Sequence, residues 1–315
     1  MTVKEVFELR KEGRIEEAYN AILPMYKVHH GHYTTLCMFW CAADMARLHI
    51  SQGNTNEAEK ILQSLIRLYP SIEDKDLSAK RTLLTIALSL KKANKSFSLY
   101  HFMQWWGIDN LTDDDYKSVQ SASHPLPSTG QRIAMHLFRE VREQNDEKQL
   151  TTTLTYIEKA LSHIPRNRHL LRAKALLLCR LGQTKEAEKI YRQLAQYGKE
   201  AYLFSELSEL TADNAEKIAL TVKAIQLQRT ETFRQKDRLR LAQMLQHKRP
   251  PFARYEVDMC VKTRQIAKQH NNRRINALLR QLQDVTPATT NEQQAFYQKA
   301  LAYLQKSNPT QTRKK

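Results

Sequence analysis

The chain has 315 residues, of which 41% are apolar, and this length can hold two domains or one long array of repeats. It contains only 7 glycines and 9 prolines, which excludes a protein of many short strands and favours long helices. Lysine and arginine outnumber aspartate and glutamate by 50 to 33, a formal charge of +17 that favours polyanionic partners.

The first 106 residues carry apolar side chains at helical spacing, which predicts a series of paired helices. We expect these helices at 2–12, 15–28, 34–51, from Gly53 to Tyr69, 78–93 and 95–106. Residues 107–130 break this rhythm with serine, proline and aspartate, which are typical of loops. Pairing resumes with predicted helices at 130–144, 148–163, 168–181, 184–197, 200–210, 214–228, 231–247, 252–270, 272–284 and 290–306.

This rhythm predicts two helical arrays. The expected organisation is an N-terminal array at 1–110, a linker or insertion at 111–129, a C-terminal array at 130–306 and a disordered tail at 307–315. No apolar run approaches the roughly 20 residues that span a bilayer. The chain opens on a charged helix without a signal peptide, and the spacing of Cys37, Cys41, Cys179 and Cys260 indicates reduced thiols. We therefore expect a cytoplasmic protein that makes no contact with membranes.

One ten-residue motif recurs along the chain. Residues 182–191 repeat residues 53–62 with seven of ten positions identical, and residues 13–22 form a looser copy. In each copy a glycine is followed five residues later by an alanine. Glycine suits the left-handed turn that ends one helix, and the small alanine lets the next helix approach its neighbour closely. Self-similarity of this kind is typical of helical repeats.

This spacing resembles the tetratricopeptide repeat. Pro70 stands twelve residues after Ala58, and Pro165 five residues after Ala160, as in that family. The copies are separated by 40 and 129 residues, which departs from a clean 34-residue period. The resemblance implies an all-α fold, a right-handed superhelix of antiparallel helix pairs, or α-solenoid. The structural repeat positions would be Gly13, Ala18, Gly53, Ala58, Pro70, Ala160, Pro165, Gly182 and Ala187.

A second resemblance covers the run from Leu170 to Asn271. It looks like the second half of the tetratricopeptide proteins associated with bacterial TOTE-type conflict systems, through residues 181–187, 213–219 and 233–242. The opening residues 7–19 are similar to the start of those proteins. Many of them carry a small cold-shock-like barrel after the repeats, and no strand-rich segment precedes Lys315 here. The resemblance implies a role in a bacterial conflict or defence system without that nucleic-acid-binding module.

No catalytic signature is present, neither a glycine-rich phosphate loop nor a His-Glu-x-x-His or Gly-x-Ser-x-Gly motif. We therefore predict a protein that is not an enzyme and uses no cofactor. Two clusters have alternative interpretations. His29, His30 and His32 with Cys37 and Cys41 could supply metal ligands, but the cysteines fall on an apolar helix, which favours a core role and no metal site. Trp105 and Trp106 could stack on a ligand, and packing in the core is again favoured.

The basic C-terminal third is the feature of the sequence that most strongly indicates a function. Residues 229–315 hold 19 lysines and arginines against 6 aspartates and glutamates. The candidate polyanion-binding residues are Arg234, Lys236, Arg238, Arg240, Lys248, Arg249, Arg254, Lys262, Arg264, Lys268, Arg273 and Arg274.

Three functions remain open. The first is a scaffold or adaptor that binds a partner protein or peptide on its concave face. The alternative is a protein that binds RNA or DNA regardless of sequence through region 229–274. The third is a regulatory sensor that binds a signalling peptide. Oligomeric state is not predictable from these patterns.

Overall fold

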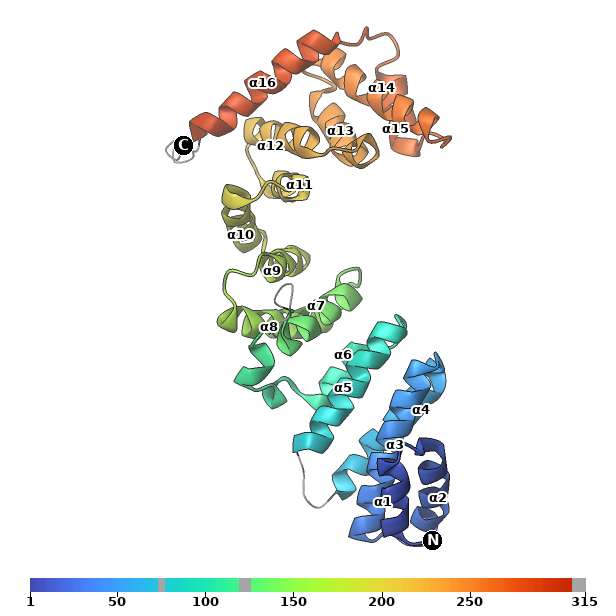
Figure 1. Ribbon diagram of the computed structural model, residues 1–315. Coiled ribbons are helices and arrows are strands. Elements are labelled where there is room, and N and C mark those ends of the chain that lie inside the picture. The colour runs from blue at the N-terminus through green and yellow to red at the C-terminus, as the bar shows by residue number, and fades with distance from the viewer. Residues whose placement is uncertain (73–76, 119–125, 308–315) are drawn as a thin grey trace. The chain divides into compact units, whose positions relative to one another are not determined.

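The computed structural model describes residues 1–72, 77–118 and 126–307, and every element in these ranges is a helix (Figure 1). The chain divides into two compact units, residues 1–144 and 145–315. The predicted all-α fold of stacked helix pairs, an α-solenoid, is confirmed. Across the described ranges, no helix is both long and apolar enough to cross a membrane.

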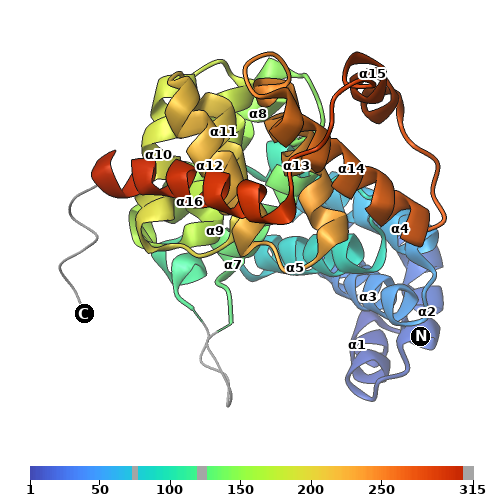
Figure 2. The same ribbon diagram turned by 90° about the horizontal axis from the view of Figure 1, so that it is seen from above.

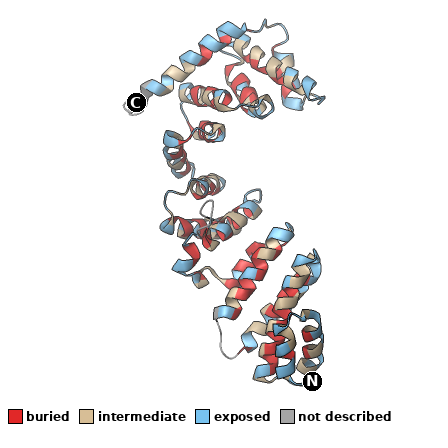
Figure 3. Ribbon diagram, in the orientation of Figure 1, coloured by how far each residue is buried: buried red, intermediate tan, exposed pale blue. Residues whose placement is uncertain are grey.

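The first unit is built around one central helix. Its elements are α1 (Val3–Lys11), α2 (Ile15–Val28), α3 (His32–Ser51), α4 (Thr55–Leu68), η1 (Tyr69–Ser71), α5 (Leu77–Ala93), α6 (Leu99–Trp106), η2 (Ile108–Asn110), η3 (Asp113–Tyr116) and α7 (Thr129–Val141). Helix α3 packs against α1, α2, α4 and α5. Because neighbours cover it on several sides, its sequence is apolar around most of its circumference, and buried residues line it (Figure 3).

Helix α7 lies in the first unit, where it packs against α6 and η3 and its Glu140 is bonded to α6. The carboxylate accepts the backbone N–H groups of Leu99 and Tyr100, each at 3.0 Å, and pairs with Lys91 at 2.7 Å. These two N–H groups open α6, where a carboxylate is favourable. The division into units therefore falls after Gln144, later than the predicted linker at 111–129.

Part of the predicted linker is ordered structure. Residues 113–116 form η3, which begins with a capping box at Thr112. Tyr116 lies so close to Gly130 that a Cβ on that glycine would stand 2.3 Å from its ring. Residues 119–125 of the linker lie outside the described residues. So do residues 308–315 of the predicted tail, whereas Ser307 is the last residue of α16.

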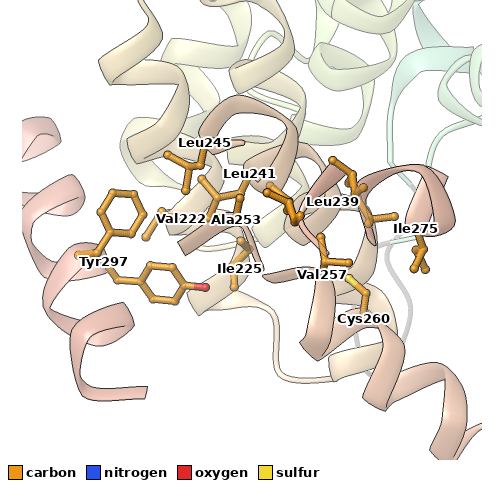
Figure 4. Close-up of a cluster of buried hydrophobic side chains, with 14 residues drawn as sticks. Val222, Ile225, Leu239, Leu241, Leu245, Ala253, Val257, Cys260, Ile275 and Tyr297 are labelled. Carbon is orange, nitrogen blue, oxygen red and sulfur yellow. The ribbon is translucent and has the colours of Figure 1, made fainter. Parts of the chain in front are cut away.

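The second unit continues the pairing. Its elements are α8 (Glu147–His163), α9 (Arg168–Arg180), α10 (Thr184–Tyr197), α11 (Ala201–Leu210), α12 (Asn214–Leu227), α13 (Glu231–Leu245), α14 (Pro250–Ile266), α15 (Arg273–Gln281) and α16 (Thr290–Ser307). Helices α9 with α10, α11 with α12 and α13 with α14 pack as successive pairs, and α16 lies across α12 (Figure 2). One buried cluster joins α12, α13, α14, α15 and α16, with Val222, Leu241 and Val257 among its members (Figure 4).

Two predicted boundaries were wrong for local reasons. Pro250 and Pro251 were expected to lie in a break between helices, but they open α14, since proline at the first helical positions loses no intrahelical bond. Helix α6 begins at Leu99 and not at residue 95, because the Ser98 side chain caps it by accepting the N–H of His101 at 3.3 Å.

The three glycines of the recurring motif share one conformation. Gly13, Gly53 and Gly182 have φ of +78°, +81° and +76°. At Gly182 the N–H bonds the carbonyl three residues earlier at 3.2 Å, and the next N–H reaches five residues back at 2.9 Å. The other two turns make the same pair of bonds. This is a Schellman ending, which satisfies the last carbonyls of a helix and turns the chain into the next one.

The other repeat positions are buried alanines and prolines that lie just after a helix. The alanines are at most 1% exposed, and they are Ala18, Ala58, Ala160 and Ala187. Pro70 lies in η1 directly after α4, and Pro165 lies in the turn after α8. The alanines thus stand where two helices approach closely, and the prolines stand where a helix has ended.

Candidate functional site

The structure places the twelve basic candidates on α13, α14, α15 and the turns between them. Their surroundings divide them into two sets. The bonded set, held by contacts within the protein, consists of Arg234, Lys236, Arg238, Arg240, Arg254 and Arg264. The exposed set consists of Lys248, Arg249, Lys262, Lys268, Arg273 and Arg274.

Arg238 is at the centre of a buried ionic network and is only 4% exposed. Its Nη1 lies 2.6 Å from an oxygen of Glu256 and donates to the Tyr297 hydroxyl at 3.3 Å. Its Nε and Nη2 donate to the carboxylate of Glu231 at 3.1 to 3.2 Å. Arg238 is therefore not available to a phosphate in solvent, which removes it from the candidate polyanion surface.

Glu256 completes this network and is fully buried. One carboxylate oxygen accepts the Gln293 side-chain N–H at 2.6 Å and the Tyr297 hydroxyl, while the other faces Arg238. Burial raises the pKa of Glu256, and the attraction of Arg238 opposes that rise. Both oxygens are engaged, so the network joins α13, α14 and α16. A cavity of about 290 Å³ lies beside it, lined in part by Arg234 and Tyr255.

Three further arginines of the bonded set hold backbone carbonyls. Arg234 donates through Nε to the carbonyl at the end of α12 at 2.6 Å, and Arg254 to the carbonyl at the end of α15 at 2.7 Å. Arg264 donates to the carbonyl of His270 at 2.7 Å. Guanidinium groups at the C-terminal ends of helices satisfy orphan carbonyls and complement the helix dipole. These arginines are thus used in joining neighbouring segments.

A ladder of ion pairs runs across the first helices of three successive pairs. On α9, Arg172 contacts Glu206 of α11 at 2.5 Å. On α13, Lys236 pairs with Glu209 of α11 at 3.0 Å, and Arg240 pairs with the same carboxylate. The carboxylates of α11 therefore neutralise the cations on either side, and this face carries little unmatched charge.

The exposed set makes no ion pair with any carboxylate among the described residues. The Arg249 guanidinium lies over the Phe296 ring, 5.3 Å from its centroid. Lys268 has a φ of +52° and ends α14 with the bond pattern that the three glycine turns also use. Phe233, on the first turn of α13, is 68% exposed. This region thus combines free cations with one exposed aromatic ring.

A groove of about 640 Å³ was not predicted from the sequence. It lies between α16 and the helices α10, α11 and α12. Its apolar lining includes Phe204, Leu207, Leu220, Leu227, Leu301 and Leu304. Two lysines at the groove, Lys199 and Lys223, form no ion pair with another described residue. The groove depends on how α16 crosses α12, and no local sequence signal encodes that crossing.

The cysteine and histidine cluster does not converge in the structure. Cys37 and Cys41 are buried in α3 with their sulfurs 3.9 Å apart. The hydrogen bond with Cys37, together with burial, raises the pKa of the Cys41 thiol. Of the described residues, no three or more His, Cys, Asp or Glu side chains gather as metal ligands.

The two tryptophans lie in different environments. Trp106 is 1% exposed, and its indole N–H donates to the carbonyl of Lys80 at 3.2 Å. Trp105 is 39% exposed, contacts the Tyr69 ring edge to face and lies tilted against the Phe102 ring. Trp106 is therefore a core residue that cannot stack on a ligand from solvent.

Known families and structures match parts of this chain. Residues 44–71 match the tetratricopeptide repeat family, and residues 170–302 match a domain of unknown function, DUF7017. No curated protein matches. Among solved structures, a tetratricopeptide repeat protein from Parabacteroides merdae ATCC 43184 matches over 82% of this chain and 97% of its own. The two are 12% identical, and the TM-score is 0.22. The segment around Gly53 is thus similar to tetratricopeptide repeats, and the second match spans α9 to most of α16.

Proposed function

We propose that this chain is a non-catalytic helical-repeat scaffold that binds a partner protein. The observation that carries the proposal is the repeated construction: the same turn at Gly13, Gly53 and Gly182 joins the two helices of a pair, and the helices bury their apolar faces against their neighbours. Stacked pairs of this kind present extended surfaces suited to a peptide or a partner helix. The tetratricopeptide match at residues 44–71 supports the same function.

Bonding of the buried acids supports a structural use for them. Glu256 and Asp237 are buried acids of the second unit, and each accepts hydrogen bonds from neighbouring helices. Burial raises the pKa of Asp237, and a bond from Ser205 opposes that rise.

In this proposal the protein works in the cytoplasm, in a bacterial conflict or defence system. Support for that setting is the similarity of residues 181–187, 213–219 and 233–242.

The scaffold proposal is tested by isolating the full chain at native abundance. We expect a tagged chain to recover one or a few proteins at fixed stoichiometry, and a tagged partner to recover this chain in return. Binding should survive nuclease and high salt, because an apolar protein interface is screened little by ions. Recovery of the chain alone, or only with nucleic acid, would contradict the proposal.

A second function, nucleic-acid binding without sequence preference, is favoured by the exposed set of cations and by Phe233. Neutralising phosphates releases counterions, so affinity falls log-linearly with salt. Exposed aromatic rings add stacking to any base. In this second proposal the exposed set makes the phosphate contacts, because the residues of the bonded set are engaged within the protein.

The test of nucleic-acid binding is fluorescence anisotropy with single-stranded RNA and DNA at several salt concentrations. If all six cations contact phosphate, the log–log slope should be about −4. Changing the exposed set to serine should abolish binding. A control variant changes six exposed cations elsewhere to serine and should keep the slope: Lys4, Lys27, Arg67, Lys92, Lys95 and Lys148. If both variants lose the same affinity for nucleic acid, binding depends on net charge alone, and a site on α13 to α15 is contradicted.

A further inference from the structure

The groove beside α16 is assembled from segments far apart in sequence. Helix α16 lies across α12 (Figure 2), and the Tyr303 hydroxyl donates to Asp213 at 2.6 Å, at the start of α12. Leu301 and Leu304 of α16 form one wall. Ala195 of α10 and Leu207 of α11 contribute to the facing side. Because these contacts lie within the second unit, the groove is a property of that unit alone.

Charge at the groove is unbalanced. Arg192 and Glu216 both line it and are joined by two bonds of 2.6 and 3.0 Å, and Arg192 also pairs with Glu188 at 2.6 Å. Lys199 is exposed and Lys223 half-buried, and neither ammonium group pairs with a carboxylate of the described chain. An apolar surface bordered by two unmatched cations complements a ligand that is apolar on one side and acidic beside it.

We propose that this groove docks an amphipathic segment of a partner protein. Leucine-sized side chains of that segment enter between α16 and α12, and its carboxylates meet Lys199 and Lys223. The volume of about 640 Å³ lies within the range of sites that enclose specific ligands. This inference rests on the proposed scaffold function and adds to it a place and a chemical class of partner.

Two other occupants fit the charges less well. The end of this chain carries Arg313, Lys314 and Lys315, which Lys199 and Lys223 would repel. A nucleic acid would meet only two unmatched cations, too few to neutralise a run of phosphates, and its backbone would leave the leucines of the groove without apolar contacts, although Tyr197 in the lining is 83% exposed. An acidic amphipathic peptide can make apolar contacts with the leucines and ion pairs with the two lysines.

The test uses the full chain and a fluorescent synthetic helix with leucines at i, i+3 and i+7 and glutamates at the flanking positions. A second probe has lysine in place of every glutamate. We expect micromolar anisotropy binding of the acidic probe and none of the basic one. In the double variant Lys199→Glu with Lys223→Glu, affinity for the acidic probe should fall at least tenfold, and the basic probe should now bind. Such a reversal cannot come from unfolding.

The matched control changes Lys185 and Lys189 to glutamate, which alters net charge equally on α10 but outside the groove lining, and should bind like wild type. Equal binding by both double variants, or no binding to wild type, would overturn the proposal. So would a wild-type dimer that the Lys199 and Lys223 reversal dissociates, or probe binding that requires removal of residues 308–315. If a partner isolated from cells still binds the reversed variant, the scaffold function stands and the groove is not its site.

Discussion

Replacing Glu256 with alanine is expected to lower the free energy of unfolding by about 3–5 kcal/mol, because the change leaves a buried charge without its partner. Arg238 would keep Glu231 but lose its bond to the fully buried carboxylate. The Tyr297 hydroxyl would lose its acceptor at the same time. Each buried donor left without a partner adds its own desolvation cost.

The measurement is urea unfolding followed by far-UV circular dichroism. Glu158→Ala is the matched control, since this glutamate of the same unit pairs with Lys174 at 2.7 Å but is about half exposed. Its loss should cost less than about 1 kcal/mol. All three tryptophans lie in the first unit, at positions 40, 105 and 106, so tryptophan fluorescence follows that unit separately.

A double variant separates the cost of leaving Arg238 as an unpaired buried charge from the contribution of the ion pair itself. Arg238→Met with Glu256→Leu removes both buried charges, so we expect it to recover part of the stability that Glu256→Ala loses. Should Glu256→Ala cost no more than Glu158→Ala, the ionic network would contribute nothing beyond its own desolvation. The apolar cluster of α12 to α16 alone would then hold α16 in place.

The helices were largely predictable because their signals are local. Helix α10 begins and ends where its apolar spacing and the flanking glycines, Gly182 and Gly198, place it. Helix α14 shows where such signals are ambiguous. A Pro-Pro pair can end one helix or open the next, and Lys268 ends α14 in a left-handed turn where glycine would have been recognisable.

The candidate site was predictable only as a region. Sequence locates the basic third of the chain, but which cations are free depends on partners far away along it. Arg238 bonds to Glu256, 18 residues later, and to Tyr297, 59 residues later. Arg240 bonds to Glu209, 31 residues earlier. Such pairings follow from how helices pack, and no spacing rule within one helix reveals them.

The second large effect concerns Trp106, whose replacement by alanine should lower the free energy of unfolding by about 3–5 kcal/mol. The indole is among the largest fully buried side chains, and its removal leaves a cavity between α5 and α6. It also deprives the Lys80 carbonyl of its bond from the indole. Trp106→Phe loses the N–H and part of the apolar contact of the larger indole but keeps one aromatic ring in the core, so it should cost less than Trp106→Ala.

Trp105→Ala is the matched comparison, because it measures the stability that a partly exposed tryptophan of the same helix contributes. Trp105 lies in the same helix and has the same side chain, but it is 39% exposed, and its ring centroid lies 6.1 Å from that of Tyr69 and 5.8 Å from that of Phe102. Its removal should cost about 1 kcal/mol, the worth of an aromatic pair. Urea unfolding by circular dichroism measures both variants. If Trp106→Ala proves no more costly than Trp105→Ala, the buried indole contributes no more than a surface ring, and the core between α5 and α6 must be held by its aliphatic side chains.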